Sequence, residues 1–304
     1  MKELNHLDLN LLKALNALLE ERNVSRAAER LALTQPAVSA MLNRLRHRFN
    51  DPLFIRSSHG MIPTNRALLL HQPVKQILES ISTLIKPIEF KPNELKYTFK
   101  LAGTENGIRT LGLPFALKIA KLAPDVKIAF FPIQGHPLEE RLSTGEWDLA
   151  ILGEQELTEN LYHQRLLSEH YICAVRHDHP ILKQEWNIET FCQLDYVLVS
   201  YNGGHFSGAT DTALAKLGKR RNVKLSIGHF SLLPDLLKQT DYATVAPYHF
   251  LQGRDDLVLL ESPFVIEGYH KAMAWHARAN YDPIQRWFRQ VMANVAEEVK
   301  TSDK

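Results

Sequence analysis

The sequence lacks the features that mark several large classes of protein. Its 304 residues include only two cysteines, Cys173 and Cys192, too few for the disulfide framework of a secreted domain. No apolar run approaches the length of a membrane-spanning helix, and the start MKELNHLDLN has no cationic segment followed by an apolar one, as a signal peptide would. We therefore expect a cytoplasmic chain whose cysteines are small buried hydrophobes, with redox sensing as the alternative.

Motifs of common enzymes and metal sites are missing as well. There is no nucleophile elbow, HExxH pair or paired-carboxylate pattern, and the glycine-rich stretch VSYNGGHFSGATD is neither a Walker sequence nor a dinucleotide fingerprint. His177, Asp178 and His179 adjoin in RHDHP, but neighbouring side chains on an extended loop diverge, and no Cys/His set with zinc spacing accompanies them. We expect no metal and no cofactor.

What the sequence does contain is an ordinary globular composition, with 45% hydrophobic and 23% charged residues. Its length predicts two or three folded units. The net charge of +2 conceals an asymmetry, because residues 1–66 hold ten basic and six acidic residues while the remainder holds 26 basic and 28 acidic ones. A basic N-terminal module on a nearly neutral body is typical of a nucleic-acid-binding protein.

The segment RAAERLALTQPAVSAMLNRLR, residues 26–46, predicts two short helices joined by a tight turn. Pro36 fits the first turn of the second helix, since the N–H that proline lacks would have no intrahelical partner there. We expect these helices at about 25–33 and from Thr34 onward, after a first helix capped by Asp8. The small side chains that would allow a close crossing, as in a helix-turn-helix, are Ala27, Ala28, Ala37 and Ala40.

The next segments predict a wing and a long helix. PLFIRSSHGMIPT has two extended arms around the turn at 58–60, which indicates a β-hairpin. Thr64 can cap an apolar helix that runs to about Ile85 and contains Pro73. A helix this apolar needs a partner, and a second copy of the chain would space two DNA-reading modules for a two-fold site. EFKPNELK, residues 89–96, then predicts a hinge.

Beyond this hinge, strands alternate with helices in the manner of a parallel α/β fold. One set includes KYTFKLA, VKIAFFPI and WDLAIL, and a second set includes HYICAVRHDHP, DYVLVSY, VKLSI and YATVAP. The strand HKAMAWHA and a last amphipathic helix could return to the first set. Two consecutive lobes of this kind imply a cleft between them.

With these segments in place, the chain resembles the LysR-type transcriptional regulators over nearly its full length. Residues 7–64 are similar to that family's winged helix-turn-helix, and RHDHP and WHARANYDPIQRWFRQV resemble its branch of aromatic-catabolism and nodulation regulators. The resemblance implies an α+β multidomain fold in which a long linker helix joins the DNA-binding domain to a two-lobed domain like a periplasmic binding protein. The implied boundaries are 1–64, 65–91 and 92–304, with lobe one at 92–166 and 269–304 and lobe two at 167–268.

The resemblance also implies a set of DNA contacts. Gln35 and Ser39 lie one turn apart at a helix N-terminus, so an amide that can pair with an adenine edge would enter the major groove beside a hydroxyl. The other implied contacts are Thr34, Pro36 and Arg44 in the same helix, Ser25 and Arg26 at phosphates, and Arg56 on the wing. The alternative for each is an ordinary solvated surface residue.

A small molecule would, by the same resemblance, bind between the lobes. The implied contacts are Thr104 and Asn106 from lobe one, and His170, Asn202, His205, Phe206 and Tyr248 from lobe two. Helices follow the loops 103–106 and 202–206, and their N-termini would suit a carboxylate or phenolate. After ATVAP, however, Tyr248 and His249 stand where several aromatic-responsive relatives have a basic residue, which favours a neutral phenolic ligand. A histidine satisfied within a packed lobe is the alternative for His170 and His205.

These inferences predict a sequence-specific transcriptional regulator, not an enzyme, controlled by a small aromatic, phenolic or organic-acid effector. The expected partners are double-stranded promoter DNA with a two-fold site, a second copy held through the linker helix, a homotetramer of such dimers, and RNA polymerase if the protein is an activator; no membrane is expected. Two alternatives stay open. One is a constitutive DNA binder without a ligand, and the other is a DNA-tethered enzyme with Glu105, His170 or His205 in acid–base roles.

Overall fold

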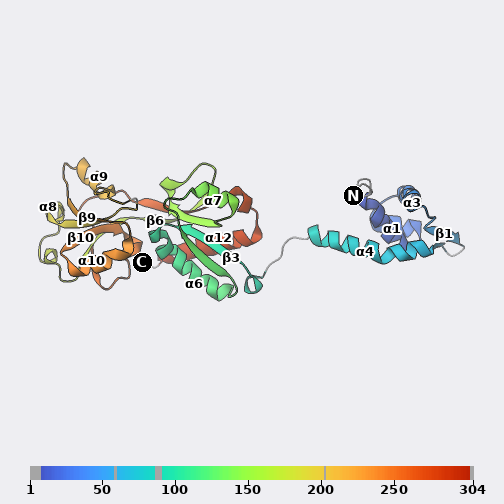
Figure 1. Cartoon of the computed structure of the whole chain (residues 1–304), viewed down its shortest axis with the longest axis horizontal. Coiled ribbons are helices and arrows are strands. Elements are labelled where there is room, and N and C mark those ends of the chain that lie inside the picture. Colours follow the sequence, from blue (N-terminus) through green and yellow to red (C-terminus); the bar gives the residue numbers. More distant parts are fainter. Residues whose placement is uncertain (1–7, 58–59, 86–90, 202, 302–304) are drawn as a thin grey trace. The chain divides into compact units, whose positions relative to one another are not determined.

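The computed structural model describes residues 8–57, 60–85, 91–201 and 203–301. The chain divides into two compact units, Met1–Glu89 and Phe90–Lys304 (Figure 1). The predicted hairpin turn at Ser58 and His59 and the first part of the predicted hinge lie outside the described residues. Within the described part, no helix is both long and apolar enough to cross a membrane.

The first unit is a helix-turn-helix followed by a hairpin and a long helix. Its elements are α1 (Leu9–Glu21), α2 (Val24–Leu31), α3 (Gln35–Phe49), β1 (Phe54–Ser57), β2 (Gly60–Pro63) and α4 (Asn65–Ile85). The predicted caps are present, because Asp8 accepts from the N–H of Asn10 and Thr34 from that of Ala37. Pro36 lies in the first turn of α3, as predicted.

The crossing of α2 and α3 depends on fewer small residues than the sequence suggested. Ala27 and Ala28 are fully buried against the leucines of α1, but Ala40 is exposed. The prediction for Ala40 was therefore wrong, because α3 turns that side chain to the solvent. Ala32 ends α2 in the left-handed region, with φ of 54°, and so makes the sharp turn without a glycine.

A carboxylate fixes the hairpin to the start of α4. Asp51 accepts hydrogen bonds from the N–H of Leu53 at 2.7 Å and from the hydroxyl of Thr64 at 2.8 Å. Arg46 of α3 donates to the carbonyls of Pro52 and Phe54 at 2.9 and 3.3 Å. Arg46 is thus partly buried and joins α3 to the wing.

The second unit contains two five-stranded sheets, each with helices packed on it (Figure 1). Lobe one has the strand order β4-β3-β5-β12-β6 and lobe two the order β11-β7-β10-β8-β9. The strands are β3 (Thr98–Gly103), β4 (Lys127–Pro132), β5 (Leu149–Gly153), β6 (Tyr162–Glu169), β7 (Tyr171–Arg176), β8 (Asp195–Val199), β9 (Asn222–Ile227), β10 (Tyr242–Pro247), β11 (Leu257–Leu260) and β12 (Tyr269–Trp275). The α-helices are α5 (Glu105–Gly107), α6 (Leu113–Leu122), α7 (Leu138–Thr144), α8 (Ile188–Gln193), α9 (Ala209–Lys216), α10 (Leu233–Gln239), α11 (Tyr248–Leu251) and α12 (Pro283–Thr301).

Both sheets are mixed, whereas the sequence predicted a parallel pattern. β3 pairs in parallel with β4 and β5, but β12 runs antiparallel to β5 and β6. In lobe two, β7 runs antiparallel to β10 and β11. The reason is that the chain crosses between the sheets twice, once from β6 to β7 and once into β12, and each crossing brings in strands of the opposite direction. We call the region where β6, β7 and β12 meet the crossover.

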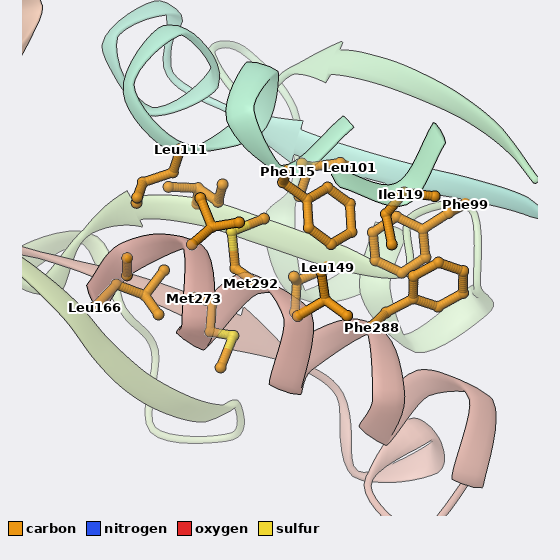
Figure 2. Close-up of a cluster of buried hydrophobic side chains, with 14 of the residues drawn as sticks. Phe99, Leu101, Leu111, Phe115, Ile119, Leu149, Leu166, Met273, Phe288 and Met292 are labelled. Atoms are coloured by element: carbon orange, nitrogen blue, oxygen red, sulfur yellow. The ribbon is translucent and has the colours of Figure 1, made fainter. Parts of the chain in front are cut away.

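Aromatic residues fill the core of lobe one. Phe288 of α12 stacks on Phe99 of β3 with ring centroids 4.1 Å apart, and Phe115 of α6 lies beside both rings (Figure 2). All three rings are fully buried. The last helix of the chain therefore completes the hydrophobic core of a lobe that begins nearly two hundred residues earlier.

Replacing Phe288 with alanine tests this packing. We expect Phe288→Ala to lower the free energy of unfolding of the second unit by about 3–5 kcal/mol, because it removes a buried ring and leaves a cavity. All four tryptophans lie in the second unit, so their fluorescence during denaturant unfolding of the full chain follows that unit alone. Val265→Ala is the control, since Val265 is 91% exposed. Equal effects of the two substitutions would contradict the assignment.

Candidate functional site

The N-terminal end of α3 presents an exposed polar surface. Thr34, Gln35 and Pro36 are exposed there and Ser39 is half-buried. Val38, Leu42 and Leu45 lie on the opposite side and are buried in the core of the unit. Gln35 and Ser39 are thus on a face that a partner can reach, on a helix that the core holds from behind.

The other predicted DNA-binding residues differ in what they contact. Arg26 donates to the carbonyl of Glu21 at 2.6 Å, and Arg44 pairs with Asp8 at 3.3 Å. Ser25 is exposed at the start of α2, and Arg56 is exposed on β1, where it has no ion pair with any described residue. Because Arg26 and Arg44 are exposed, their contacts are weak, and a phosphate could replace them.

A cavity of about 200 Å³ lies between the lobes. It opens beside an outer chamber of about 860 Å³ with which it shares Gln155, Tyr171, Ala209 and Tyr269. Its wall includes the carboxyl ends of β5, β8 and β10, together with Thr104, which follows β3. Open α/β sheets bind their ligands at these ends of the strands. The lining residues are Thr104, Ile151, Leu152, Gly153, Gln155, Glu156, Tyr171, Leu198, Val199, Tyr201, Gly208, Ala209, Thr210, Phe230, Val245, Pro247, Tyr269 and Lys271.

Three tyrosines give this cavity aromatic walls with hydroxyl groups. The rings of Tyr171 and Tyr269 lie 6.0 Å apart, and Tyr201 packs edge-on against Phe230 at 5.6 Å. Burial raises the pKa of all three hydroxyls above the usual value, and the nearby Glu169 or Glu105 carboxylate raises it further. The hydroxyls therefore stay protonated and can donate hydrogen bonds at neutral pH.

A buried ion pair lies behind the cavity, at the crossover. Lys271 of β12 and Glu169 of β6 are 1% and 3% exposed, and the ammonium contacts one carboxylate oxygen directly. The other oxygen accepts from Nδ1 of His249 in α11 at 2.9 Å. Burial by itself raises the pKa of Glu169, but the His249 hydrogen bond and the Lys271 charge outweigh it, so the pKa lies below its usual value.

Polar residues of lobe one complete this network. Lys271 donates to Oδ1 of Asn106 and to Oγ1 of Thr110, both at 3.1 Å, and Asn106 donates to the hydroxyl of Tyr269 at 2.9 Å. The network extends from Tyr269 in the cavity wall to His249 in lobe two. A ligand that contacts Tyr269 or Lys271 therefore touches the group of residues that joins the lobes.

The crossover also brings two backbones very close together. Tyr269 pairs with Glu169, and the adjacent Gly268 lies against the Glu169 carbonyl, with which a Cβ would collide. Only glycine fits here without a shift of one strand.

The structure separates the residues that the sequence grouped around an effector. Thr104 lines the cavity, and Asn106 lies behind it in the network. His170 is exposed and stacks on Tyr248 at 4.7 Å, beside the crossover, while His205 and Phe206 are exposed on the loop before α9. Asn202 lies outside the described residues. An effector-binding role for these residues stays a prediction.

The helix N-termini predicted to receive an anion are occupied by the chain itself. The hydroxyl of Thr104 accepts from the N–H of Gly107, and the carboxylate of Asp211 accepts from that of Gly208. Glu105 of lobe one accepts from the N–H groups of Phe230 and Ser231 in lobe two, at 2.7 and 2.9 Å. These contacts weaken the case for a carboxylate or phenolate at those positions.

Sequence reasoning missed Lys271, Glu169 and the three tyrosines of the cavity. One signal was present, since Lys271 directly precedes the apolar run 272–275 of its strand, where a lysine needs a buried partner. The partner could not be identified, because Glu169 is 102 residues earlier in the chain.

The remaining candidate residues have separate local contacts. Nε2 of His177 contacts the carbonyl of Asp255, Asp178 pairs with Arg176, and His179 accepts from the N–H of Ile181, so the three neighbours diverge. Burial raises the pKa of the Cys173 thiol to about 12 and also raises that of Cys192, which disfavours thiolate chemistry.

Comparison with known families gives one matching family model for each unit. Residues 9–68 match the model of the bacterial regulatory helix-turn-helix protein, lysR family, and residues 93–297 match the LysR substrate binding domain. The chain is 35% identical to the HTH-type transcriptional activator NagR of Ralstonia sp., over 97% of this chain and 99% of that protein. It is 36% identical to the HTH-type transcriptional activator NahR of Pseudomonas putida (95% and 98%), and 28% identical to Nodulation protein D 1 of Rhizobium leguminosarum bv. phaseoli (95% and 93%).

Solved structures show the same architecture. A probable transcriptional regulator from Pseudomonas aeruginosa is 28% identical and superposes with a TM-score of 0.59, covering 97% of this chain and 99% of that one. The LysR family transcriptional regulator CbnR, at 15% identity, has a TM-score of 0.57 with 94% and 100% coverage and supports the fold alone.

The buried ion pair gives a prediction about stability. We expect Lys271→Met to lower the free energy of unfolding of the second unit by about 3–5 kcal/mol, because the Glu169 carboxylate would stay buried without its cation. The double substitution Lys271→Met with Glu169→Gln should be less damaging than Lys271→Met alone, since it removes the unpaired charge. Tryptophan fluorescence in denaturant measures both, and a double variant less stable than the single one would refute the charge argument.

Proposed function

The chain belongs to the LysR family of transcriptional regulators, and from this membership we propose that it controls transcription in response to a neutral, single-ring aromatic effector held in the 200 Å³ cavity. It is a DNA-binding regulator with an effector-binding domain, and its family consists of regulators, not enzymes. The enzyme alternative is thereby set aside. The observation that carries the proposal is the charge balance of the cavity.

Among the described lining residues, the ionised side chains are already satisfied. The Lys271 ammonium is neutralised by Glu169, and the Glu156 carboxylate accepts from the N–H of Gly153 at 3.1 Å. An anionic ligand would add an uncompensated charge to a partly desolvated site, at a large cost in free energy. A neutral ligand avoids this cost.

Size and wall chemistry support a single ring. A cavity of about 150 Å³ suffices for benzene in another protein, so 200 Å³ leaves room for a ring with one or two polar substituents. Tyr171, Tyr201 and Tyr269 supply aromatic contacts together with hydroxyl donors.

For DNA, we propose that Gln35 and Ser39 contact base edges in the major groove. Thr34, Pro36 and Arg44 would lie beside them, while Ser25, Arg26 and Arg56 would contact phosphates. We propose that the protein acts on its DNA in the cytoplasm.

A dimer through α4 would present two such surfaces to a two-fold site. The support is its exposed apolar side chains, of which Leu69, Leu84 and Ile85 are 71–83% exposed. We propose that these dimers pair into a tetramer, and that RNA polymerase is a further partner if the protein activates.

Two substitutions separate base reading from phosphate binding. On a duplex selected by the wild-type protein from a random pool, we expect Gln35→Ala to raise the Kd about tenfold and relax base preference, because a paired amide is lost. Arg56→Ala should instead weaken all duplexes alike and reduce the slope of log K against log salt by about one.

Fluorescence anisotropy measures both effects. Gln290→Ala and Arg220→Gln, on exposed residues of the second unit, are the matched controls. An unchanged base preference for Gln35→Ala would exclude it from base reading.

The effector proposal is tested by screening small rings against the full chain. We expect phenol or catechol to raise the midpoint of thermal unfolding of the second unit, followed by tryptophan fluorescence, and benzoate to raise it less, because of its charge. Ala209→Phe should abolish the shift by filling the cavity, whereas Ala277→Phe, on an exposed residue, should retain it. A stronger shift with benzoate that Ala209→Phe abolishes would overturn the neutral class.

A further inference from the structure

A second cavity, of about 560 Å³, lies between the lobes and has no lining residue in common with the first. Lobe one contributes Arg109, Leu113 and Phe130 to it, and lobe two contributes Phe250 and Arg254. Leu113 and Phe130 are 51% and 42% exposed, so an apolar wall is open to an occupant. Its volume is in the range of small-molecule sites, about 300–1,000 Å³.

Two guanidinium groups flank one aromatic ring in this cavity. The central carbons of Arg109 and Arg254 lie 5.0 and 5.9 Å from the centroid of Phe250. Among the described residues, none has a hydrogen bond or an ion pair with the guanidinium group of Arg109. Burial lowers the pKa of Arg109, and the like charge of Arg254 lowers it further, while the Glu105 and Asp256 carboxylates oppose this shift without cancelling it.

Arg254 also has an unsatisfied donor. Its Nε is buried and has no hydrogen-bond partner among the described residues. Asp256 is 3.8 Å from another of its nitrogens, but that carboxylate is also paired with Lys238 at 2.9 Å. A buried donor without a partner is rare in native proteins and indicates a missing water, ion or ligand.

The other titratable groups of the cavity leave this positive charge largely uncancelled. Both oxygens of Glu105 accept backbone N–H groups, at Phe230 and Ser231, and one lies 3.8 Å from Nδ1 of His229. The Glu105 charge is therefore already directed at a helix N-terminus. Arg109 has no ion pair with any described residue, and Arg254 has only the 3.8 Å contact with the Asp256 carboxylate that it shares with Lys238.

From this geometry we propose that the cavity between Arg109 and Arg254 is a second ligand site, and that it takes an aromatic carboxylate. The carboxylate accepts hydrogen bonds from the two guanidinium groups, and the ring packs on Phe130, Leu113 and Phe250. This ligand contacts both lobes. The protein would then respond to an anionic compound as well as to the neutral ring proposed for the first cavity. The site stands on its own contacts and does not depend on the effector proposed above.

Isothermal titration of the full chain with 1-naphthoate tests the site, with 1-naphthalenemethanol as the neutral match. We expect naphthoate to bind more tightly than the alcohol, and Arg109→Gln and Arg254→Gln each to raise its Kd about tenfold or more, because each removes a charged hydrogen-bond donor. Arg254→Lys should have an intermediate effect, since it keeps the charge and loses the planar fork. Arg220→Gln should change nothing.

The first cavity is excluded as the site by Ala209→Phe, which should leave naphthoate binding unchanged. The thermal midpoint from tryptophan fluorescence checks that each arginine variant is folded. If Arg254→Gln does not fold, the Kd of naphthoate for Arg254→Lys, which keeps the charge, tests the role of Arg254 in its place. The proposal is overturned by equal binding of the alcohol, by arginine variants that bind like the wild type, by loss of binding in Ala209→Phe, or by no binding at millimolar naphthoate.

Discussion

The pairing of Lys271 with Glu169 is the constraint on which the second unit depends. Both side chains are almost completely removed from water, and such a pair is tolerated only when its remaining hydrogen-bonding positions are filled. Asn106, Thr110 and His249 fill them from both lobes. The need to fill these positions therefore fixes three parts of the fold. They are the register of β6 against β12, the start of α11 and the first helical turn after β3.

This arrangement explains how a small molecule could influence a structure much larger than itself. Tyr269 and Lys271 belong to the cavity wall and to the network at the same time. A ligand in the cavity would change the surroundings of Tyr269 and Lys271, and through their hydrogen bonds it would act on both lobes. The contact of Glu105 with the N–H groups of Phe230 and Ser231 is a second connection between the lobes. The two connections join the lobes at separate places.

Much of the first unit could be predicted from local patterns, because its helices begin at Asp8, Thr34 and Thr64, whose side chains accept backbone N–H groups in the first turn. The second unit was harder. Its alternation of strands and helices predicted two lobes, but β6 and β11 were not recognised, and strand direction depends on pairings between distant segments. The residues of the cavity wall and its network were less predictable still, since Lys271 and Glu169 form their ion pair only when the crossover brings them together.

Gly268 limits how the sequence of this protein can change over time. Its lack of a side chain lets β12 lie against the Glu169 carbonyl, and any larger residue would push apart the strands that hold the ion pair. The ends of β5, β8 and β10, in contrast, line the cavity without such a restriction. New ligand preferences can therefore evolve around the cavity while the crossover stays unchanged, so this fold can acquire a different specificity without losing its means of connecting the lobes.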